Sequence, residues 1–305
     1  MQQFDMAFWR RMVEALCVLL IALASGEVAF AAPAPTDQAA IERGVESALF
    51  VQRPLLDQAL ARISPTDPKQ IGMYFLGVAG DGQQEVFRRE VEFVHQQFDR
   101  DFATSGRSLV LINSRSTVDR VPMATRLSLR EALHTIAQRM DRNKDILFLF
   151  LTSHGSRDHQ LSLAQLGMDL PSLSASELAS MLKQQQIRWK VIVISACFAG
   201  GFIAPLQDDH TLIITAARAD RSSFGCADDN DFTYFGRAFF KESLPRSASF
   251  NIAFEQAKRL VNQWEQTDRR AAPKGGKLLP SLPQIVSPAP IAAHLAAWRH
   301  ALPRH

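Results

Sequence analysis

The sequence lacks the features by which several classes of protein are recognised. Its net charge is only +3, and no basic cluster is interleaved with aromatic residues, so nucleic acid is not an expected partner. There is no glycine-rich phosphate loop of the Walker or dinucleotide type. Five histidine and aspartate residues gather in loops without the spacing of zinc or calcium ligands, so we expect no metal site and no cofactor: Asp158, His159, Asp208, Asp209 and His210.

Long apolar runs are also missing, apart from one near the start. Residues 1–31 resemble a secretory signal peptide, because Arg10 and Arg11 precede an apolar core at 15–24 and Ala29-Phe30-Ala31 has the small-x-small pattern of a cleavage site. Cleavage would leave an exported chain, periplasmic or secreted. The alternative is an uncleaved membrane anchor, although a spanning helix needs about 20 apolar residues and this core is shorter. We expect no membrane span in the mature chain.

Hydrophobic periodicity predicts an α/β fold for residues 70–270. A helical segment at 32–69, divided at Pro54, precedes this domain, and a proline-rich tail with a short terminal helix follows it at 271–305. Because strands alternate with helices, we expect a mostly parallel sheet with helices on both faces. The expected strands are 71–79, 108–113, 145–152, 191–197 and 211–216. The expected helices are 85–102, 128–140, one that starts with the capping box Ser174-Ala175-Ser176-Glu177, 232–242 and 249–266.

Two of these strands end in a chemically reactive side chain. Every residue of the stretch 191–197 is apolar or small, which is typical of a strand buried on both faces, and the stretch ends at Cys197 before two glycines. The stretch 145–153 has the same character and ends at His154-Gly155. Since open α/β sheets place their active sites at the carboxyl ends of parallel strands, the pattern predicts a cysteine nucleophile facing a histidine base.

Cysteine itself is scarce, with three in 305 residues. Removal of the leader, which contains Cys17, leaves only Cys197 and Cys226. In an exported protein these two can form a disulfide, or Cys197 can be a reactive thiol and Cys226 unrelated to it. A cysteine at a strand end followed by glycines favours the second interpretation. His154 alone would be interpreted as structural, and only the pair of strand ends points to catalysis.

These motifs resemble the caspase-like cysteine peptidases, a family with a three-layer α/β sandwich fold. The closest similarity is to the legumain branch, which includes asparaginyl endopeptidases and glycosylphosphatidylinositol transamidases. The resemblance extends over residues 71–266. The stretches that carry it are Phe150-Leu151-Thr152-Ser153-His154-Gly155-Ser156, Ser195-Ala196-Cys197-Phe198-Ala199-Gly200-Gly201, Ile214-Thr215-Ala216-Ala217, Arg221-Ser222-Ser223-Phe224-Gly225-Cys226 and Thr233-Tyr234-Phe235-Gly236.

The resemblance implies a cysteine endopeptidase that acts on peptides or proteins. It implies Cys197 as nucleophile, His154 as its acid–base partner, and the backbone N–H groups of Gly155 and Cys197 as the oxyanion hole. The same thioester acyl-enzyme can be captured by an amine, so a transpeptidase or transamidase is the alternative among enzymes. A non-catalytic peptide-binding relative is the alternative outside enzymes. The sequence does not indicate the oligomeric state.

The substrate pocket departs from that of the legumains. Ser222 and Ser223 match serines that line the pocket in the family, but Phe198 and Arg237 replace two acidic residues that help to bind asparagine there. A guanidinium pairs favourably with a carboxylate. We therefore expect an acidic residue rather than asparagine before the scissile bond, unless Arg237 pairs instead with an aspartate of the segment 228–231.

Overall fold

A six-stranded sheet with the order β2-β1-β3-β6-β7-β8 forms the centre of the chain. The computed structural model describes residues 35–271 and 279–302. The five neighbouring strands from β2 to β7 run parallel, and β8 is antiparallel to β7 at one edge. The expectation of a mostly parallel sheet is therefore confirmed. The strands are β1 (Met73–Ala79), β2 (Ser108–Ile112), β3 (Ile146–Thr152), β6 (Trp189–Ser195), β7 (Thr211–Thr215) and β8 (Gln284–Val286).

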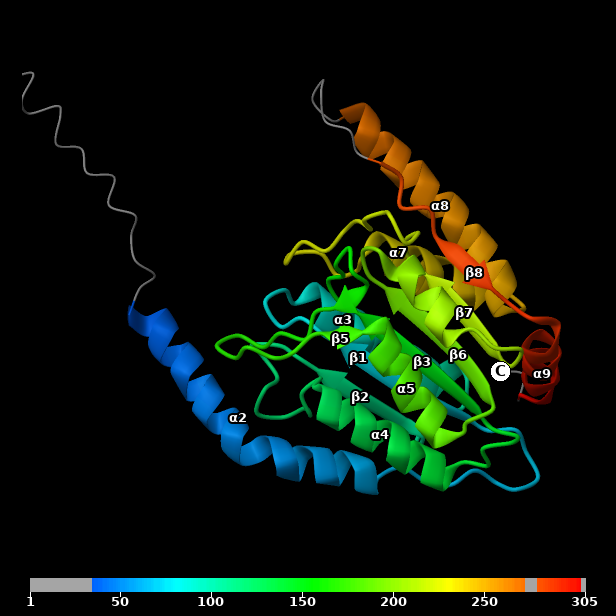
Figure 1. Ribbon diagram of the computed structural model, residues 1–305, viewed down its shortest axis with the longest axis horizontal. Coiled ribbons are helices and arrows are strands. Elements are labelled where there is room, and N and C mark those ends of the chain that lie inside the picture. Colours follow the sequence, from blue (N-terminus) through cyan, green and yellow to red (C-terminus); the bar gives the residue numbers. More distant parts are fainter. Residues whose placement is uncertain (1–34, 272–278, 303–305) are drawn as a thin grey trace, which may run out of the picture. The chain divides into compact units, whose positions relative to one another are not determined.

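Helices cover both faces of this sheet, which gives the three layers. One face packs against α4 (Arg126–Arg139) and α5 (Ala175–Gln185), which lie in front of the sheet in Figure 1. The other face packs against α3 (Val86–Asp101), α8 (Phe250–Ala271) and α9 (Ala289–Ala301). Shorter elements complete the set: β4 (Gln160–Leu161), β5 (Leu173–Ser174), η1 (Ala199–Phe202), α6 (Ile203–Leu206), α7 (Tyr234–Gly236), η2 (Arg237–Ser243) and η3 (Leu244–Arg246).

The central strands β3 and β6 are apolar along their length because helices cover them on both sides. Every residue of β3 is buried, and so is β6 after Trp189. Their register pairs Ile146 with Trp189 and Thr152 with Ser195. The two strands therefore end level with each other, at the edge where the chain continues to His154 and Cys197.

Three local expectations need correction. The segment 232–242 is not one α-helix, because α7 is a single turn that continues as the π-helix η2. The tail contains the expected terminal helix, α9, but its residues 284–286 also add the edge strand β8, which the sequence did not predict. Ser174 does cap α5 by accepting a hydrogen bond from the Glu177 N–H, but the Glu177 carboxylate pairs with Arg126 at 3.1 Å, so no reciprocal bond completes a capping box.

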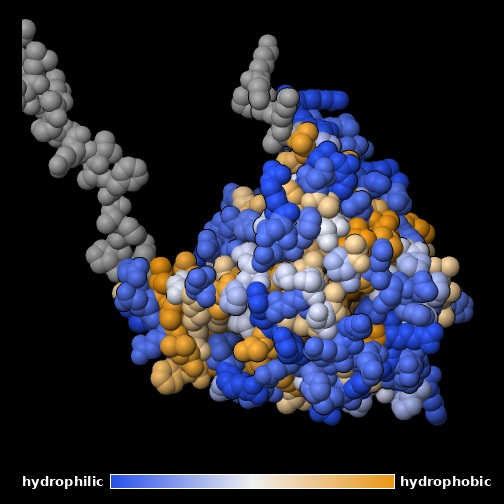
Figure 2. All heavy atoms as spheres, in the orientation of Figure 1, coloured by the Kyte–Doolittle hydropathy of each residue, from blue (hydrophilic) through white to orange (hydrophobic). Residues whose placement is uncertain are grey.

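The helix α2 (Pro35–Ala61) runs continuously through Pro54, whereas the sequence predicted a division there. Figure 1 shows it as a bent but unbroken helix. Figure 2 shows apolar side chains on its surface, where Leu49 and Phe50 are 77% and 76% exposed. Among residues 35–271 and 279–302, no helix combines the length and apolar character required to cross a membrane. The expected signal peptide at 1–31 lies outside the described residues.

Candidate active site

His154 and Cys197 each lie two residues beyond the paired ends of β3 and β6. The chain stays paired just past the strands, since Ser153 donates its N–H to the Ser195 carbonyl at 3.2 Å. The backbone of Gly155 then passes so close to Cys197 that a Cβ on Gly155 would lie 2.0 Å from the Cys197 carbonyl oxygen. Only glycine allows this approach. The two strands thus deliver the imidazole and the thiol to one edge of the sheet.

The imidazole of His154 is half-buried against helix α3. Its ring packs edge-on against Phe87, with ring centroids 5.1 Å apart and an interplanar angle of 84°. The backbone carbonyl of His154 accepts a hydrogen bond from the Ser162 N–H at 2.9 Å. This contact ties the residue after β3 to the segment that forms β4. His154 is therefore held by an aromatic ring on one side and by its own backbone on the other.

The sulfur of Cys197 lies against Ser223 in the loop after β7. The Ser223 N–H donates to Sγ at 3.2 Å, and the Ser223 hydroxyl and carbonyl oxygens lie 3.6 and 3.7 Å from the same sulfur. A donor aimed at the sulfur stabilises the thiolate, which is the nucleophilic form. Ser223 is one of the two serines expected at the substrate pocket. Ser222, the other, is exposed.

Two backbone donors at this edge have no acceptor. Within the described part of the chain, neither the Gly155 N–H nor the Cys197 N–H donates a hydrogen bond to another group. Gly155 and Leu161 form an antiparallel bridge, but the two hydrogen bonds of this bridge are made by their neighbours. The Ser162 N–H donates to the His154 carbonyl, and the Ser156 N–H donates to the Gln160 carbonyl. Unpaired backbone donors beside a nucleophile are the groups that an oxyanion requires.

The turn after Cys197 is built around a residue in the left-handed region. Phe198 has a φ of 56°, and its N–H donates to the Arg221 carbonyl at 2.7 Å. Its carbonyl oxygen accepts a hydrogen bond from Nδ1 of His159 at 3.2 Å, and the guanidinium of Arg157 lies 5.2 Å from its ring centroid. The glycines that follow leave room for this turn, because a Cβ on Gly201 would meet the His159 ring at 2.1 Å.

Cys197 and Cys226, the two cysteines among the described residues, are both free thiols in the structure. Burial raises the pKa of the Cys226 thiol, and the neighbouring Cys197 raises it further. A raised pKa lowers the thiolate fraction and so the reactivity of Cys226. This difference in surroundings favours Cys197 as the reactive thiol of the two.

Arg237 lies in a different hollow from the thiol. Its guanidinium packs over the Trp264 ring at 4.9 Å and pairs with Glu242 at 3.2 Å, and among the ion pairs of the described residues it has none with the aspartates of 228–231. The pocket that it lines contains neither Phe198 nor Cys197, and its other lining residues include Tyr234 and Asp268. Phe198 and Arg237, which the sequence assigned to one substrate pocket, are therefore not brought together there.

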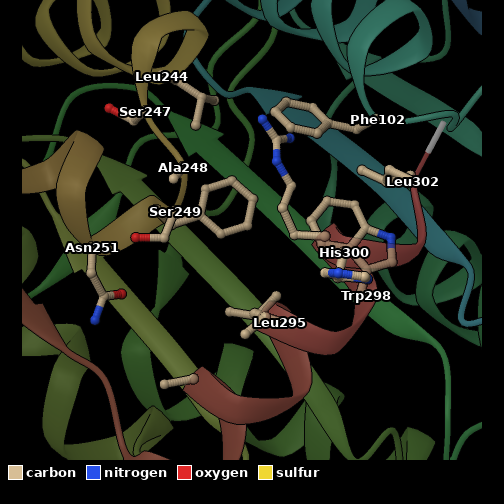
Figure 3. A pocket seen from close by; sticks show the side chains of 14 residues that line it. Phe102, Leu244, Ser247, Ala248, Ser249, Asn251, Leu295, Trp298, His300 and Leu302 are labelled. Carbon is tan, nitrogen blue, oxygen red and sulfur yellow. The ribbon is translucent and has the colours of Figure 1, made fainter. Parts of the chain in front are cut away.

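Another pocket, of about 430 Å³, is lined mainly by α9 and the segment that precedes α8. Figure 3 shows Trp298 and Leu295 of α9 beside it, with Phe102 across from them. His154 and Cys197 are not among its lining residues. The candidate active site is therefore not this apolar hollow but the exposed edge where β3 and β6 end.

Part of the chain that contains both strand ends matches a known protein family. Residues 128–272 match the Peptidase C13 family. The match covers just under half of the chain and includes both His154 and Cys197. It supports a cysteine peptidase of the legumain type, in agreement with the resemblance of the motifs.

A solved structure similar to the chain is the crystal structure of caspase-1 from Spodoptera frugiperda. It has 13% sequence identity and a TM-score of 0.48, and the alignment covers 74% of this chain and 88% of that one. A comparison with curated proteins gives no match.

One set of residues at this site escaped the sequence analysis. Glu90 of α3 is completely buried, and its carboxylate is bonded to Thr152 at the end of β3 and to Thr233 before α7. The Thr233 hydroxyl is in turn 3.0 Å from the Ser195 hydroxyl at the end of β6. The sequence does contain a sign that Glu90 is buried, because Glu90 falls on the apolar face of α3, between Phe87 and Val94.

Proposed function

We propose that this chain is a cysteine endopeptidase in which Cys197 and His154 form the catalytic dyad. The observation that carries the proposal is the parallel, in-register ending of β3 and β6, which brings both residues to one edge beside two unpaired backbone N–H groups. The Peptidase C13 match over the same strands supports it. The substrates are peptides or proteins.

The reaction follows from the groups at this edge. The Cys197 thiolate attacks the carbonyl carbon of the scissile bond, and the carbonyl oxygen takes the negative charge. The N–H groups of Gly155 and Cys197 then stabilise that oxyanion, and the loss of one such donor typically costs about 10²–10³ in rate. His154 protonates the leaving amine, which leaves a thioester. It next removes a proton from water, whose oxygen attacks the thioester carbonyl. The C–S bond then breaks, the acyl group leaves as a carboxylic acid, and His154 returns the proton to the Cys197 sulfur.

Labelling with a substrate-like, thiol-reactive peptide probe tests this proposal directly. We expect the wild-type protein to be labelled at Cys197, while Cys197→Ala is not labelled and Cys226→Ser is labelled normally. The labelled protein is digested and mapped by mass spectrometry, so the modified cysteine is identified. Equal labelling of wild type and Cys197→Ala, or cleavage of no peptide in a library by the wild type, contradicts a peptidase at this site.

We also propose that the chain is exported after cleavage of residues 1–31. The support is the sequence of the leader, with two arginines before an apolar core and Ala29-Phe30-Ala31 at its end. Mass spectrometry of the protein from its native source tests this. A chain that starts near Ala32 is the expected result, and an intact leader in the membrane fraction contradicts it.

A further inference from the structure

Beneath the candidate active site lies a buried carboxylate that no step of the proposed reaction uses. Glu90 has no exposed surface, although a carboxyl group is rarely buried without a partner. Its Oε2 accepts a hydrogen bond from the Thr152 hydroxyl at 2.6 Å. Its Oε1 accepts from the Thr233 hydroxyl at 2.8 Å and from the Thr233 N–H at 3.2 Å. Three donors thus converge on one buried group.

The network reaches both strands that carry the dyad. Thr152 and Ser195 are register partners at the ends of β3 and β6. Thr152 bonds Glu90 directly, while the Ser195 hydroxyl lies 3.0 Å from the Thr233 hydroxyl. Because Thr233 gives its own proton to the carboxylate, Ser195 is the donor in that pair. Two routes of hydrogen bonds therefore lead to Glu90. One runs from Ser195 of β6 through the Thr233 hydroxyl, and the other runs directly from Thr152 of β3.

The surroundings fit the carboxylate closely. A Cβ on Gly236 would lie 1.5 Å from Oε1 of Glu90, so the helix turn α7 approaches to a distance that only glycine permits. The Gly236 N–H bonds to the Thr233 hydroxyl at 3.0 Å, which fixes the orientation of that hydroxyl. One turn earlier on α3, Phe87 packs against the His154 ring. The same face of α3 therefore contacts the histidine and the strand ends below it.

We propose that Glu90 is a positioning residue of the candidate active site, which holds the ends of β3 and β6, and with them His154 and Cys197, in their relative places through Thr152 and Thr233. This inference rests on the proposed function, because it gives Glu90 a part in the same site. Glu90 touches neither the substrate nor the reacting atoms. Its effect passes through the two threonines and the strand ends.

The protonation state of Glu90 sets how firmly the network holds. The ionised carboxylate accepts all three hydrogen bonds, whereas a protonated carboxyl loses an acceptor position and must itself find an acceptor. Burial raises the pKa of Glu90 to about 7, against the hydrogen bonds from Thr152 and Thr233, which lower it. The change between the two forms therefore falls in the neutral range.

Burial and the hydrogen bonds from Thr152 and Thr233 set the pKa of Glu90, and no neighbouring charged group in the described part of the chain is paired with it. Within the described residues, no titratable group of the elements around Glu90 is hydrogen-bonded or ion-paired to it. These groups are Tyr74 of β1, Asp81 after β1, Asp145 before β3, His154 after β3, Lys190 of β6, Cys197 after β6, Tyr234 of α7, and Arg237, Lys241 and Glu242 of η2. The strand β2 carries no titratable side chain. On α3 itself, Arg88 pairs with Glu85 and Glu92, and Arg89 pairs with Asp231.

The test compares Glu90→Gln, Glu90→Ala and the wild type, with Glu92→Gln as a matched control on the same helix. Glu92 is on the outer side of α3 and pairs with Arg88, so its substitution leaves the network intact. The values of kcat and KM for a fluorogenic peptide are measured between about pH 5 and pH 9, on either side of the Glu90 titration. All four proteins contain the same Cys197 and His154, so the ratio of wild-type to variant kcat reports the effect of the substitution.

We expect the kcat ratio of wild type to Glu90→Gln to be close to one at low pH and to rise several-fold as the pH passes about 7. Glu90→Ala is expected to lower kcat by about 10- to 100-fold, with little change in KM, because a small displacement of reacting groups has effects of this size. Glu92→Gln follows the wild type at every pH. A pH-independent ratio for Glu90→Gln, together with kcat within about twofold of wild type for Glu90→Ala, overturns the proposal.

A second measurement separates this inference from the proposed function. The rate at which iodoacetamide alkylates Cys197 is followed by peptide mapping in the same proteins over the same pH range. Under the proposal this rate depends on how His154 and the strand ends are held relative to the sulfur, and it requires no peptidase activity. If the wild type cleaves no peptide but the alkylation ratio rises through pH 7, the proposed function fails and Glu90 remains a positioning residue. If cleavage occurs and neither ratio changes, the Glu90 inference is wrong.

Discussion

The substitution Glu90→Gln replaces a buried, titratable carboxyl by an amide of the same shape, so its effect on stability depends on pH. A carboxyl whose pKa is higher in the folded than in the unfolded chain binds its proton more tightly when folded. Its contribution to stability is therefore fully present below the unfolded pKa, near 4.5, and is lost as the pH rises through the folded pKa of about 7. The Gln variant has no such loss.

The size of the effect follows from the two pKa values. A rise from 4.5 to about 7 corresponds to about 3 kcal/mol, since each pKa unit is worth about 1.4 kcal/mol. The side chain is completely buried, so solvent does not screen this value. Relative to the wild type, Glu90→Gln is expected to become more stable by about 3 kcal/mol between pH 4 and pH 8. Any fixed cost of burying the amide is the same at both pH values and cancels.

Urea unfolding of wild type, Glu90→Gln and Glu92→Gln across this range measures the difference directly. Several carboxyls have lowered pKa values and produce the opposite trend, among them Asp228 beside Arg115, but they are common to all three proteins. The wild-type and Glu92→Gln curves are expected to run parallel. If the Glu90→Gln curve runs parallel to them as well, Glu90 does not titrate in the neutral range and the reasoning about its burial is refuted.

Four further results are expected. Cys197→Ser and His154→Ala each abolish peptide cleavage but keep the wild-type circular dichroism spectrum, because both side chains lie at the sheet edge and not in the core; near-normal turnover by either contradicts the dyad. Gly155→Ala lowers activity strongly, because its Cβ would lie 2.0 Å from the Cys197 carbonyl oxygen, whereas Ala at the open position Gly44 is a control that leaves kcat unchanged. Cys226→Ser retains full activity in non-reducing buffer, since Cys197 and Cys226 are both free thiols; a loss of activity would assign Cys226 a role. The preference for an acidic residue before the scissile bond stays a prediction. In a peptide library, Arg237→Asp weakens this preference only if the guanidinium leaves Glu242 and Trp264 and contacts the substrate. Faster cleavage after asparagine by the wild type contradicts the prediction.

The sequence predicted the core strands and their reactive ends because the relevant signals are local. A run such as Val191-Ile192-Val193-Ile194 has no polar face, so only a strand covered on both sides accommodates it, and the structure has β6 in that position. Through the family resemblance Ser223 was expected to line the substrate pocket, but its approach to the Cys197 sulfur was not predicted. Its N–H reaches the sulfur because the loop after β7 folds back over the end of β6, and no local pattern specifies that path.

The expectations that failed depend on contacts between distant segments. Pro54 interrupts one backbone hydrogen bond, yet α2 continues through it and packs Leu56 into the core. The strand β8 has only three residues, and it exists because the backbone of β7 offers an unpaired edge to the tail. Arg237 was placed by its proximity in sequence to a family motif. In the structure, Glu242 and Trp264 determine where its guanidinium lies.

Glu90 shows that a helical pattern can contain a functional signal that its apolar residues conceal. Phe87, Val91, Val94 and Phe98 define the buried face of α3, and Glu90 falls within that face, three residues after Phe87 and four before Val94. An apolar residue there would fill the same volume without the cost of burying a carboxyl. The strand ends above it would then lose the acceptor that holds Thr152 and Thr233. Glu90 lowers stability at neutral pH, yet it bonds to Thr152 of β3 directly and is linked to Ser195 of β6 through Thr233. Such a residue is best explained by its effect on the site, where proteins commonly give up stability for activity.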